Sequence, residues 1–305
     1  MNIDIIGVPI FYGCDKVGVE KGPDILRENG LINIFKKNHN TIDIGNIAVN
    51  YINPIYKYES NNKLKYLNSV ISTNKKLAYE VNRSLNNNRL PIVIGGDHSL
   101  ALGSIAGCSK YYKSDIGVIW VDAHGDINTE ETSPTGNIHG MPLAASMGVG
   151  HDRLKNLYFN DIKVKPENVF ILSCRDLDPG EIELINKLNI NTYNINKIKR
   201  DGVDNILVDI LNIIKNKNIK NIHFSYDIDC LDPVYVPGTG TPVENGLMFD
   251  ESEKIIKTIL NTGLVRSVDF VEFNPDLDID NITLNTCIKL LNIFSNELKW
   301  KKKDI

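Results

Sequence analysis

The sequence predicts an α/β protein built around a parallel β-sheet, and three observations support this fold class. Short segments rich in valine, isoleucine and phenylalanine recur along the chain and alternate with longer segments of helical spacing. About eight of the short segments have the length and composition of strands. The 305 residues, 42% of them hydrophobic, are enough to bury a large core. We therefore expect residues 1–305 to form a single α/β domain.

Each expected strand is a run of β-branched or aromatic residues between turn-forming residues. In chain order, the expected strands cover residues 3–8, 41–44, 91–94, 116–121, 169–173, 191–193, 221–225 and 265–271. Each expected helix is a longer stretch in which apolar residues recur every three or four positions. In chain order, the expected helices cover residues 23–36, 64–85, 100–109, 180–188, 203–217, 250–260 and 281–298.

The alternation of strands and helices leaves two architectures open. A closed barrel of β-α units and an open sheet with helices on both faces repeat the same pattern. In both, the loops that leave the carboxyl ends of the strands converge on one crevice. Polar residues in these loops are therefore the first candidates for a functional site.

Charge and cysteine content argue against several kinds of partner. Lysine and arginine total 34 and aspartate and glutamate total 38, a net charge of −4, which gives no electrostatic reason to expect nucleic-acid binding. No apolar run approaches the roughly 20 residues of a membrane span, and the first residues lack the basic leader of a signal peptide. The five cysteines are scattered, as reduced thiols are. We expect a cytoplasmic protein with neither a membrane nor a nucleic-acid partner.

Acidic residues and histidines are concentrated directly after three of the expected strands. They are His98, Asp122, His124, Asp126, Asp227 and Asp229. In an extended segment, residues two apart point the same way, so Asp122, His124 and Asp126 would share one face and Asp227 and Asp229 another. Two such acidic faces on adjoining strands would repel each other unless cations lay between them. Together with His98, these residues are the predicted metal ligands.

The residue types also indicate which metal would bind. Carboxylates with a minority of imidazoles suit Mn²⁺ better than tetrahedral Zn²⁺, which prefers cysteine and histidine. Six ligands suit two ions that share carboxylates about 3.5–4 Å apart and lower the pKa of a bound water. A single acidic residue at a strand end is more often a helix cap or a loop brace, and Asp97 and Asp232 are interpreted in that way.

Several motifs in a consistent order resemble the ureohydrolases and, within them, the arginases, especially the bacterial type. The resemblance spans nearly the whole chain. Besides the clusters above, it rests on the sequences Gly-Val-Glu at 18–20, Gly-Pro at 22–23, Gly-Asn-Ile-His-Gly-Met-Pro at 136–142 and Gly-Thr-Pro at 240–242. It implies a three-layer α/β/α fold with an open, mainly parallel eight-stranded sheet. It also implies a homo-oligomer, either a trimer or a hexamer.

The resemblance further implies two Mn²⁺ ions per subunit and a substrate. One ion would be held by His98, Asp122, Asp126 and Asp227, and the other by His124, Asp122, Asp227 and Asp229. A metal-bridging hydroxide would attack the guanidinium carbon of L-arginine and yield L-ornithine and urea. A guanidinium is a poor electrophile, so a nucleophile generated at neutral pH fits this reaction.

The same resemblance assigns roles to residues outside the metal cluster. Asp126 would orient the hydroxide and accept its proton, Glu272 would bind the guanidinium, and His139 would act as an acid or proton shuttle for the departing amine. The substrate's α-carboxylate would contact Asn128, Thr135 and Asn137, and its α-amino group would contact Asp178 and Glu181, with Thr241 as a further polar wall. Thr135 stands where many relatives have serine.

Other interpretations stay open at this point. Glu272 could form an internal salt bridge, and His139 could simply begin a helix. A ureohydrolase acting on agmatine, which lacks the α-carboxylate, would gain nothing from Asn128, Thr135 and Asn137. A non-catalytic metal-binding regulatory protein with the same fold is a third possibility, although none of the expected ligands is missing.

Overall fold

The strands of the protein form one open sheet. The structure is a computed structural model that describes residues 1–58 and 63–300. The strand order is β2-β1-β3-β8-β7-β4-β5-β6, and every pairing is parallel. The strands are β1 (Asn2–Val8), β2 (Asn40–Asn46), β3 (Leu90–Gly95), β4 (Gly117–Val121), β5 (Val169–Leu172), β6 (Asn191–Tyr193), β7 (Ile222–Asp227) and β8 (Val265–Val271). The expected open sheet is confirmed, because β2 and β6 are its two unpaired edges.

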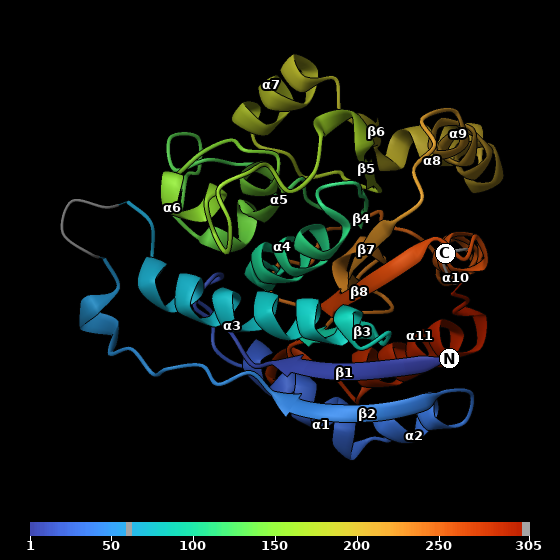
Figure 1. Cartoon of the computed structure of the whole chain (residues 1–305), viewed down its shortest axis with the longest axis horizontal. Helices are drawn as coiled ribbons and strands as arrows, with labels where there is room; N and C mark the ends of the chain where they lie inside the picture. Colours follow the sequence, from blue (N-terminus) through green and yellow to red (C-terminus); the bar gives the residue numbers. More distant parts are fainter. Residues whose placement is uncertain (59–62, 301–305) are drawn as a thin grey trace.

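Helices cover both faces of this sheet (Figure 1). They are α1 (Gly22–Glu28), α2 (Leu31–Lys36), α3 (Leu67–Asn86), α4 (Ala101–Tyr112), α5 (Pro142–Ser146), α6 (Asp152–Lys155), α7 (Pro179–Leu188), α8 (Ile195–Asp201), α9 (Val203–Asn216), α10 (Phe249–Asn261) and α11 (Ile282–Glu297). Helices α3 and α4 lie side by side over one face, and α10 and α11 pack together on the other.

The two helical layers have separate apolar cores because successive residues of a strand point to opposite faces. On β4, Ile119 and Val121 pack into the core beneath α9, α10 and α11. Val118 and Trp120, on the same strand, pack into the core beneath α3 and α4. This alternation on a fully buried strand confirms the three-layer α/β/α arrangement.

The helices differ from the expectation in a few places. The expected helix at 23–36 is divided into α1 and α2, because Gly30 adopts a left-handed conformation with φ 96°. The expected helix at 64–85 begins three residues later, since Tyr66 is also left-handed and its N–H bonds to the carbonyl of Lys57. Helices α5, α6 and α8 were not expected, and they are too short to give a clear periodic signal.

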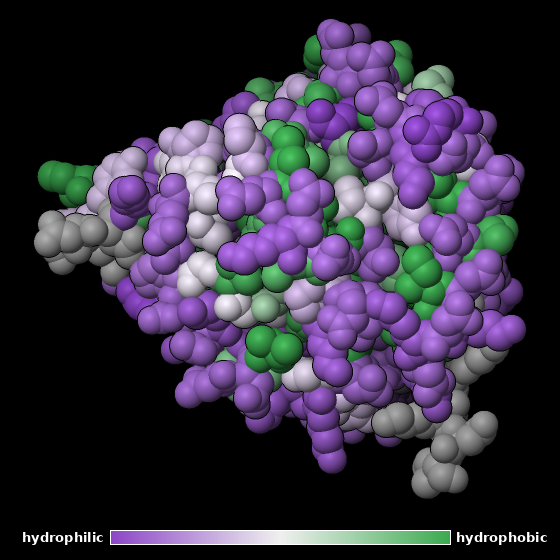
Figure 2. Space-filling model, turned by 90° about the horizontal axis from the view of Figure 1, so that it is seen from above, coloured by the Kyte–Doolittle hydropathy of each residue, from purple (hydrophilic) through white to green (hydrophobic). Residues whose placement is uncertain are grey.

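Across residues 1–58 and 63–300, no helix has both the length and the apolar character needed to cross a bilayer. The face seen in Figure 2 is mostly hydrophilic, and its apolar residues form separate groups. For the function, the relevant part of the fold is the edge of the sheet at which the carboxyl ends of the strands lie.

Strand order places the predicted ligands close together at that edge. Strands β3 and β4 precede His98 and Asp122, and β7 ends at Asp227. These three strands are near the centre of the sheet, with only β8 between β3 and β7. All strands run the same way, so their carboxyl ends share one edge, as in other open α/β sheets. Glu272 directly follows β8 and joins the same group.

Candidate active site

A pocket opens at the carboxyl ends of the central strands, and its lining is unusually acidic. It is lined by His124, Asp126, Asn128, Ser133, Pro134, Thr135, Asn137, His139, Gly140, Asp176, Asp178, Glu181, Asp227, Asp229, Thr241 and Glu272. All predicted site residues except His98 and Asp122 belong to this lining, and those two are buried beside it. None of the described lining residues is lysine or arginine, so the pocket suits cationic groups.

The local backbone that positions the predicted ligands is mostly not extended. Asp122 and His124 follow β4 in a loop, and Asp229 lies in a 3₁₀ turn (Ile228–Cys230) after β7. Asp126 has φ 51°, in the left-handed region. The prediction that Asp122, His124 and Asp126 lie in one extended segment and so share a face is therefore wrong, although the three side chains do meet at one site. The loop brings the three side chains together by turning back, not by strand alternation.

One group of potential ligands surrounds the Nδ1 atom of His98. This nitrogen lies 3.1 Å from Oδ2 of Asp122, 3.2 Å from Oδ2 of Asp126 and 3.1 Å from Oδ2 of Asp227. It is buried and has no hydrogen-bond partner among the described residues. Ligands bonded at about 2.1 Å to an octahedral ion would be about 3.0 Å from one another. An unpartnered nitrogen ringed by carboxylate oxygens at this spacing fits a divalent cation.

A second group adjoins the first through Asp122. The Nδ1 atom of His124 is 3.3 Å from Oδ1 of Asp122 and 3.2 Å from Oδ2 of Asp229. Asp122 thus directs one carboxylate oxygen toward each histidine. His98, Asp122 and Asp227 form one cluster able to hold a metal, and Asp122, His124 and Asp229 form another. The donor atoms present fit two neighbouring ions.

In these groups the charge of Asp122 makes the other carboxylates harder to ionise. Burial would raise the pKa of Asp122 as well, but His124 and His98 lower it. Burial, together with the charges of Asp229 and Asp122, raises the pKa of Asp227 well above its usual range. Burial and the charge of Asp122 raise the pKa of Asp126 to about 6. Neighbouring negative charges that are buried destabilise the folded protein unless a cation lies between them. The repulsion expected from the sequence is therefore present in the folded protein.

Two residues that the sequence analysis did not single out hold the first group in place. The ring of Trp120 stacks on His98 with centroids 3.9 Å apart, and its Nε1 atom donates to Oδ2 of Asp122 at 3.0 Å. Nε2 of His98 is 2.7 Å from Oγ of Ser225. Trp120 and Ser225 each precede a predicted ligand by two residues. Because residues two apart on a strand point to the same face, the predicted ligands Asp122 and Asp227 could have indicated both Trp120 and Ser225.

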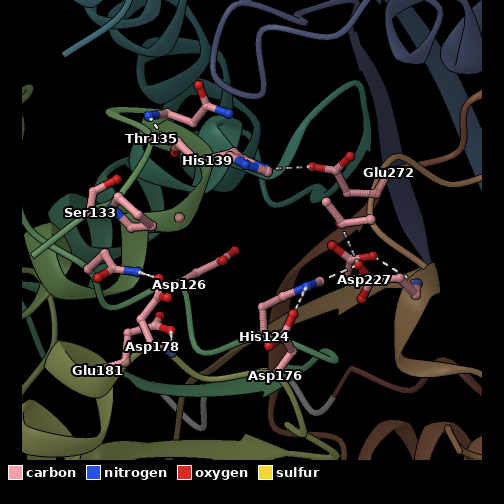
Figure 3. A pocket seen from close by; sticks show the side chains of 16 residues that line it. His124, Asp126, Ser133, Thr135, His139, Asp176, Asp178, Glu181, Asp227 and Glu272 are labelled. Carbon is pink, nitrogen blue, oxygen red and sulfur yellow. Dashed lines mark hydrogen bonds and ion pairs between the residues drawn. The ribbon is translucent and has the colours of Figure 1, made fainter. Parts of the chain in front are cut away.

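Glu272 and His139 face each other across the pocket (Figure 3). Nδ1 of His139 is 3.5 Å from Oε1 of Glu272, and the same oxygen accepts a 2.8 Å hydrogen bond from the main-chain N–H of His98. Burial would lower the pKa of His139, but the Glu272 carboxylate and the charges of Asp126 and Asp97 raise it above its ordinary value. His139 lies in a short 3₁₀ turn and not at the start of an α-helix.

Glu272 also has a strained backbone. Its φ is 69°, a left-handed conformation that is uncommon for a residue other than glycine. Asp126, on the opposite loop, shares this property. Strain of this kind is retained where the surroundings enforce it, commonly at functional sites. Both residues were predicted to act in the reaction.

The remaining predicted residues line the outer part of the pocket. Nδ2 of Asn128 donates to Oδ2 of Asp178 at 2.8 Å, and Oγ1 of Thr135 accepts from the N–H of Asn137 at 3.1 Å. Glu181 accepts hydrogen bonds from the N–H groups of Ile127 and Asp178, and the latter bond belongs to the capping box of α7. Burial is the main reason that the pKa of Glu181 is raised to about 7.

Two further predicted residues link this outer region to its surroundings. The hydroxyl of Thr241 donates to Oδ2 of Asp229 at 3.2 Å. Nδ2 of Asn137 donates to the carbonyl of Cys14 at 3.0 Å, which leaves its buried Oδ1 without a partner among the described residues. Asn137 therefore retains an unused hydrogen-bonding atom at the pocket.

The two acids predicted to brace loops do so. Asp97 accepts hydrogen bonds from the N–H groups of Gly13, Cys14 and Ser99, and Asp232 accepts from those of Val234 and Gly246. The sequence analysis did not assign roles to four lining residues, which are Ser133, Pro134, Gly140 and Asp176. Three of them share the 128–140 segment with predicted residues, and only their position in the loop could have indicated them.

Comparisons with known proteins agree with this geometry. The arginase family profile matches residues 1–294. The arginase of Staphylococcus aureus is 42% identical over 97% of each chain. The crystal structure of the Bacillus caldovelox arginase superposes with a TM-score of 0.92 at 38% identity, covering 97% of this chain and 98% of that one. An Entamoeba histolytica arginase in complex with L-ornithine gives a TM-score of 0.87 at 33% identity, covering 96% and 99%. The chain therefore belongs to the arginase family.

Proposed function

We propose that this protein is a manganese-dependent arginase that hydrolyses L-arginine to L-ornithine and urea. The observation that carries the proposal is a pair of His/Asp groups, joined through Asp122, at the base of an acidic pocket. Such a pocket attracts both divalent cations and the positively charged guanidinium of arginine. Membership of the arginase family supports the same reaction.

The proposed metal centre uses the residues of both groups. His98, Asp122, Asp126 and Asp227 would hold one Mn²⁺, and His124, Asp122, Asp227 and Asp229 would hold the other. The carboxylate-rich donor set favours Mn²⁺ over Zn²⁺. When bound, a pair of such ions lowers the pKa of water and so supplies hydroxide at neutral pH.

Asp126 and Glu272 would then align the reactants. The carboxylate of Asp126, whose Oδ2 lies 3.2 Å from Nδ1 of His98, is suited to orient the nucleophile and to accept its proton at Oδ. Glu272 would bind the guanidinium through charge-assisted hydrogen bonds and fix the orientation of its plane. The 2.8 Å bond from the N–H of His98 holds Glu272 beside the first metal group.

His139 would deliver a proton to the departing amine. Its raised pKa keeps a larger fraction of the imidazole protonated near neutral pH. Its position on the pocket wall, opposite Glu272, supports this role, because a guanidinium bound by Glu272 would lie close to it. The product ornithine would leave with the proton supplied by this histidine.

The outer pocket would recognise the amino-acid end of the substrate. Asn128, Thr135 and Asn137 would bind the α-carboxylate, and the carboxylates of Asp178 and Glu181 would attract the α-amino group. The hydroxyl of Thr241 would complete the wall. The hydroxyl of Thr135 accepts from the N–H of Asn137, which leaves its own O–H able to donate to a carboxylate.

The proposal extends to the organisation of the protein. A single sheet that collects strands from both halves of the sequence supports one domain over residues 1–305. All five cysteines are free thiols, which supports a reducing compartment such as the cytoplasm. Assembly into a homo-oligomer, a trimer or a hexamer, is proposed from the family resemblance.

The choice between arginine and agmatine gives the first prediction. We expect urea release from L-arginine to exceed release from agmatine. Thr135→Val should raise KM for arginine about tenfold, since it removes a hydrogen bond to a charged group, and should leave KM for agmatine unchanged. Steady-state urea assays with both substrates measure this, and a preference for agmatine would overturn the assignment.

Metal binding and proton transfer can be separated by a second pair of variants. Asp227→Ala should lose bound manganese and all urea production, because both proposed sites share this carboxylate. His139→Ala should retain manganese and lose about 10²- to 10⁴-fold in kcat. Metal analysis and urea assays, with the exposed Asp204→Ala as control, test both outcomes. Full metal content and full activity in Asp227→Ala would contradict the bridging role of this carboxylate. If the unaltered protein binds manganese but produces no urea, the alternative of a non-catalytic regulatory protein is favoured instead.

The charge of Glu272 sets the third prediction. Replacing the carboxylate by an amide removes the main group that favours the protonated imidazole, so Glu272→Gln should lower the pKa of His139. The imidazole NMR signals of the metal-free protein, followed against pH, measure this pKa. The exposed Glu183→Gln should leave it unchanged. An identical titration midpoint in Glu272→Gln and the unaltered protein would refute the pairing.

A further inference from the structure

Arg175 occupies an unusual position beside the second metal group. It follows β5, and its guanidinium donates hydrogen bonds to six main-chain carbonyl oxygens: those of Ser173, Asp229, Cys230, Leu231, Val243 and Glu244. The shortest, from Nη2 to Asp229 and to Val243, are both 2.8 Å. Within the described part of the chain, all of its hydrogen bonds go to the main chain. The guanidinium thus acts as a bracket between loops and not as a partner of a carboxylate.

The bracket reaches each loop that carries the second metal group. The carbonyl of Ala123, between Asp122 and His124, accepts hydrogen bonds from the N–H groups of Arg175 and Asp176. The N–H of Ala123 in turn donates to Oδ1 of Asp229 at 3.2 Å. One residue therefore ties the 122–124 loop, through its backbone, to the 229–231 turn and the 243–244 segment, through its side chain.

The first metal group is supported differently. Asp227 is the last residue of β7 and is paired with Val271 of the adjoining strand. His98 is held by Ser225, the Trp120 ring and Oε1 of Glu272. These supports come from strands and from the residue that follows β8. Arg175 touches none of them. The two metal groups are nevertheless joined by the shared Asp122 and by the 2.9 Å hydrogen bond from the N–H of Asp229 to Oδ1 of Asp227.

We infer that Arg175 is a positioning residue that sets the affinity of the His124–Asp229 metal site without setting that of the His98–Asp227 site. This inference rests on the proposed binuclear centre. The planar guanidinium has five N–H donors in a fixed plane for these six carbonyls, whereas a lysine ammonium has only three donors and could keep at most part of the contacts. Without it, the 229–231 turn keeps its backbone hydrogen bond with Leu247 but loses its side-chain tie to the 243–244 segment. Asp229 is then held beside His124 by fewer contacts, those with Thr241 and the N–H of Ala123 among them.

The direction of the effect distinguishes positioning from simple charge. Arg175 is a cation near a cation site, so removing its charge alone would strengthen the binding of both ions. Losing the bracket would instead weaken the binding of one ion. Arg175→Lys keeps the charge and loses the planar donors, whereas Arg175→Met loses both. Matched replacements of Arg200, whose side chain is 72% exposed, serve as controls.

Calorimetric titration of the metal-free protein with Mn²⁺ measures the two affinities. In both Arg175→Lys and Arg175→Met, we expect the affinity of the ion at the His124–Asp229 site to fall about 10- to 100-fold, the range usual for residues that orient metal ligands. The other affinity should equal that of the unaltered protein. Anomalous diffraction from variant crystals with one equivalent of Mn²⁺ should show the ion beside His98 and Asp227.

Three outcomes would overturn the inference. Tighter binding of both ions in Arg175→Met, with unaltered binding in Arg175→Lys, would mean that only charge matters. An equal loss at both sites would mean general destabilisation, and no change at either site would mean that the bracket is dispensable. If Arg175→Met does not fold, Arg175→Lys carries the test. Failure of the unaltered protein to bind two ions would instead refute the proposed binuclear centre.

Discussion

Mutual repulsion among buried carboxylates is the constraint around which this protein is organised. Asp122, Asp126, Asp227 and Asp229 are all buried, and the charge of Asp122 raises the pKa of each of the other three, whereas His124 and His98 lower the pKa of Asp122 itself. Two histidines, each with an Nδ1 atom directed at these carboxylates, complete a set of donors suited to cations. A cation pair converts this repulsion into attraction, so the site is most stable when it binds the ions that its proposed chemistry requires.

The fold holds these groups together from different directions. Strands β3, β8, β7 and β4 are neighbours in the sheet, and the segments that follow them carry the site. Aromatic stacking and the Ser225 hydroxyl support His98, whereas the Arg175 bracket supports the loops around His124 and Asp229. The left-handed conformations of Asp126 and Glu272 show that these surroundings are strong enough to enforce uncommon backbone geometry.

Much of this arrangement could be predicted from the sequence because its signals are local. Alternating strand and helix segments predicted the fold class, and the dense acidic motifs after three strands predicted residues that the structure brings together as candidate ligands. The choice of an open sheet over a closed barrel depended on the resemblance to the arginases, because both architectures repeat the same alternation of strands and helices. The contacts of Arg175 had no local signal, because they join main-chain carbonyls from segments about 55 to 70 positions away. The extended-face argument failed because the chain turns at Asp126.

The central claim is that the His98 and His124 groups together hold a pair of divalent cations. Anomalous diffraction from crystals of the unaltered protein saturated with Mn²⁺ tests it most directly. The account predicts two peaks about 3.5–4 Å apart, one bonded to Nδ1 of His98 and the other to Nδ1 of His124, with Asp122 contacting both. A single peak, or ions bound away from these side chains, would contradict it.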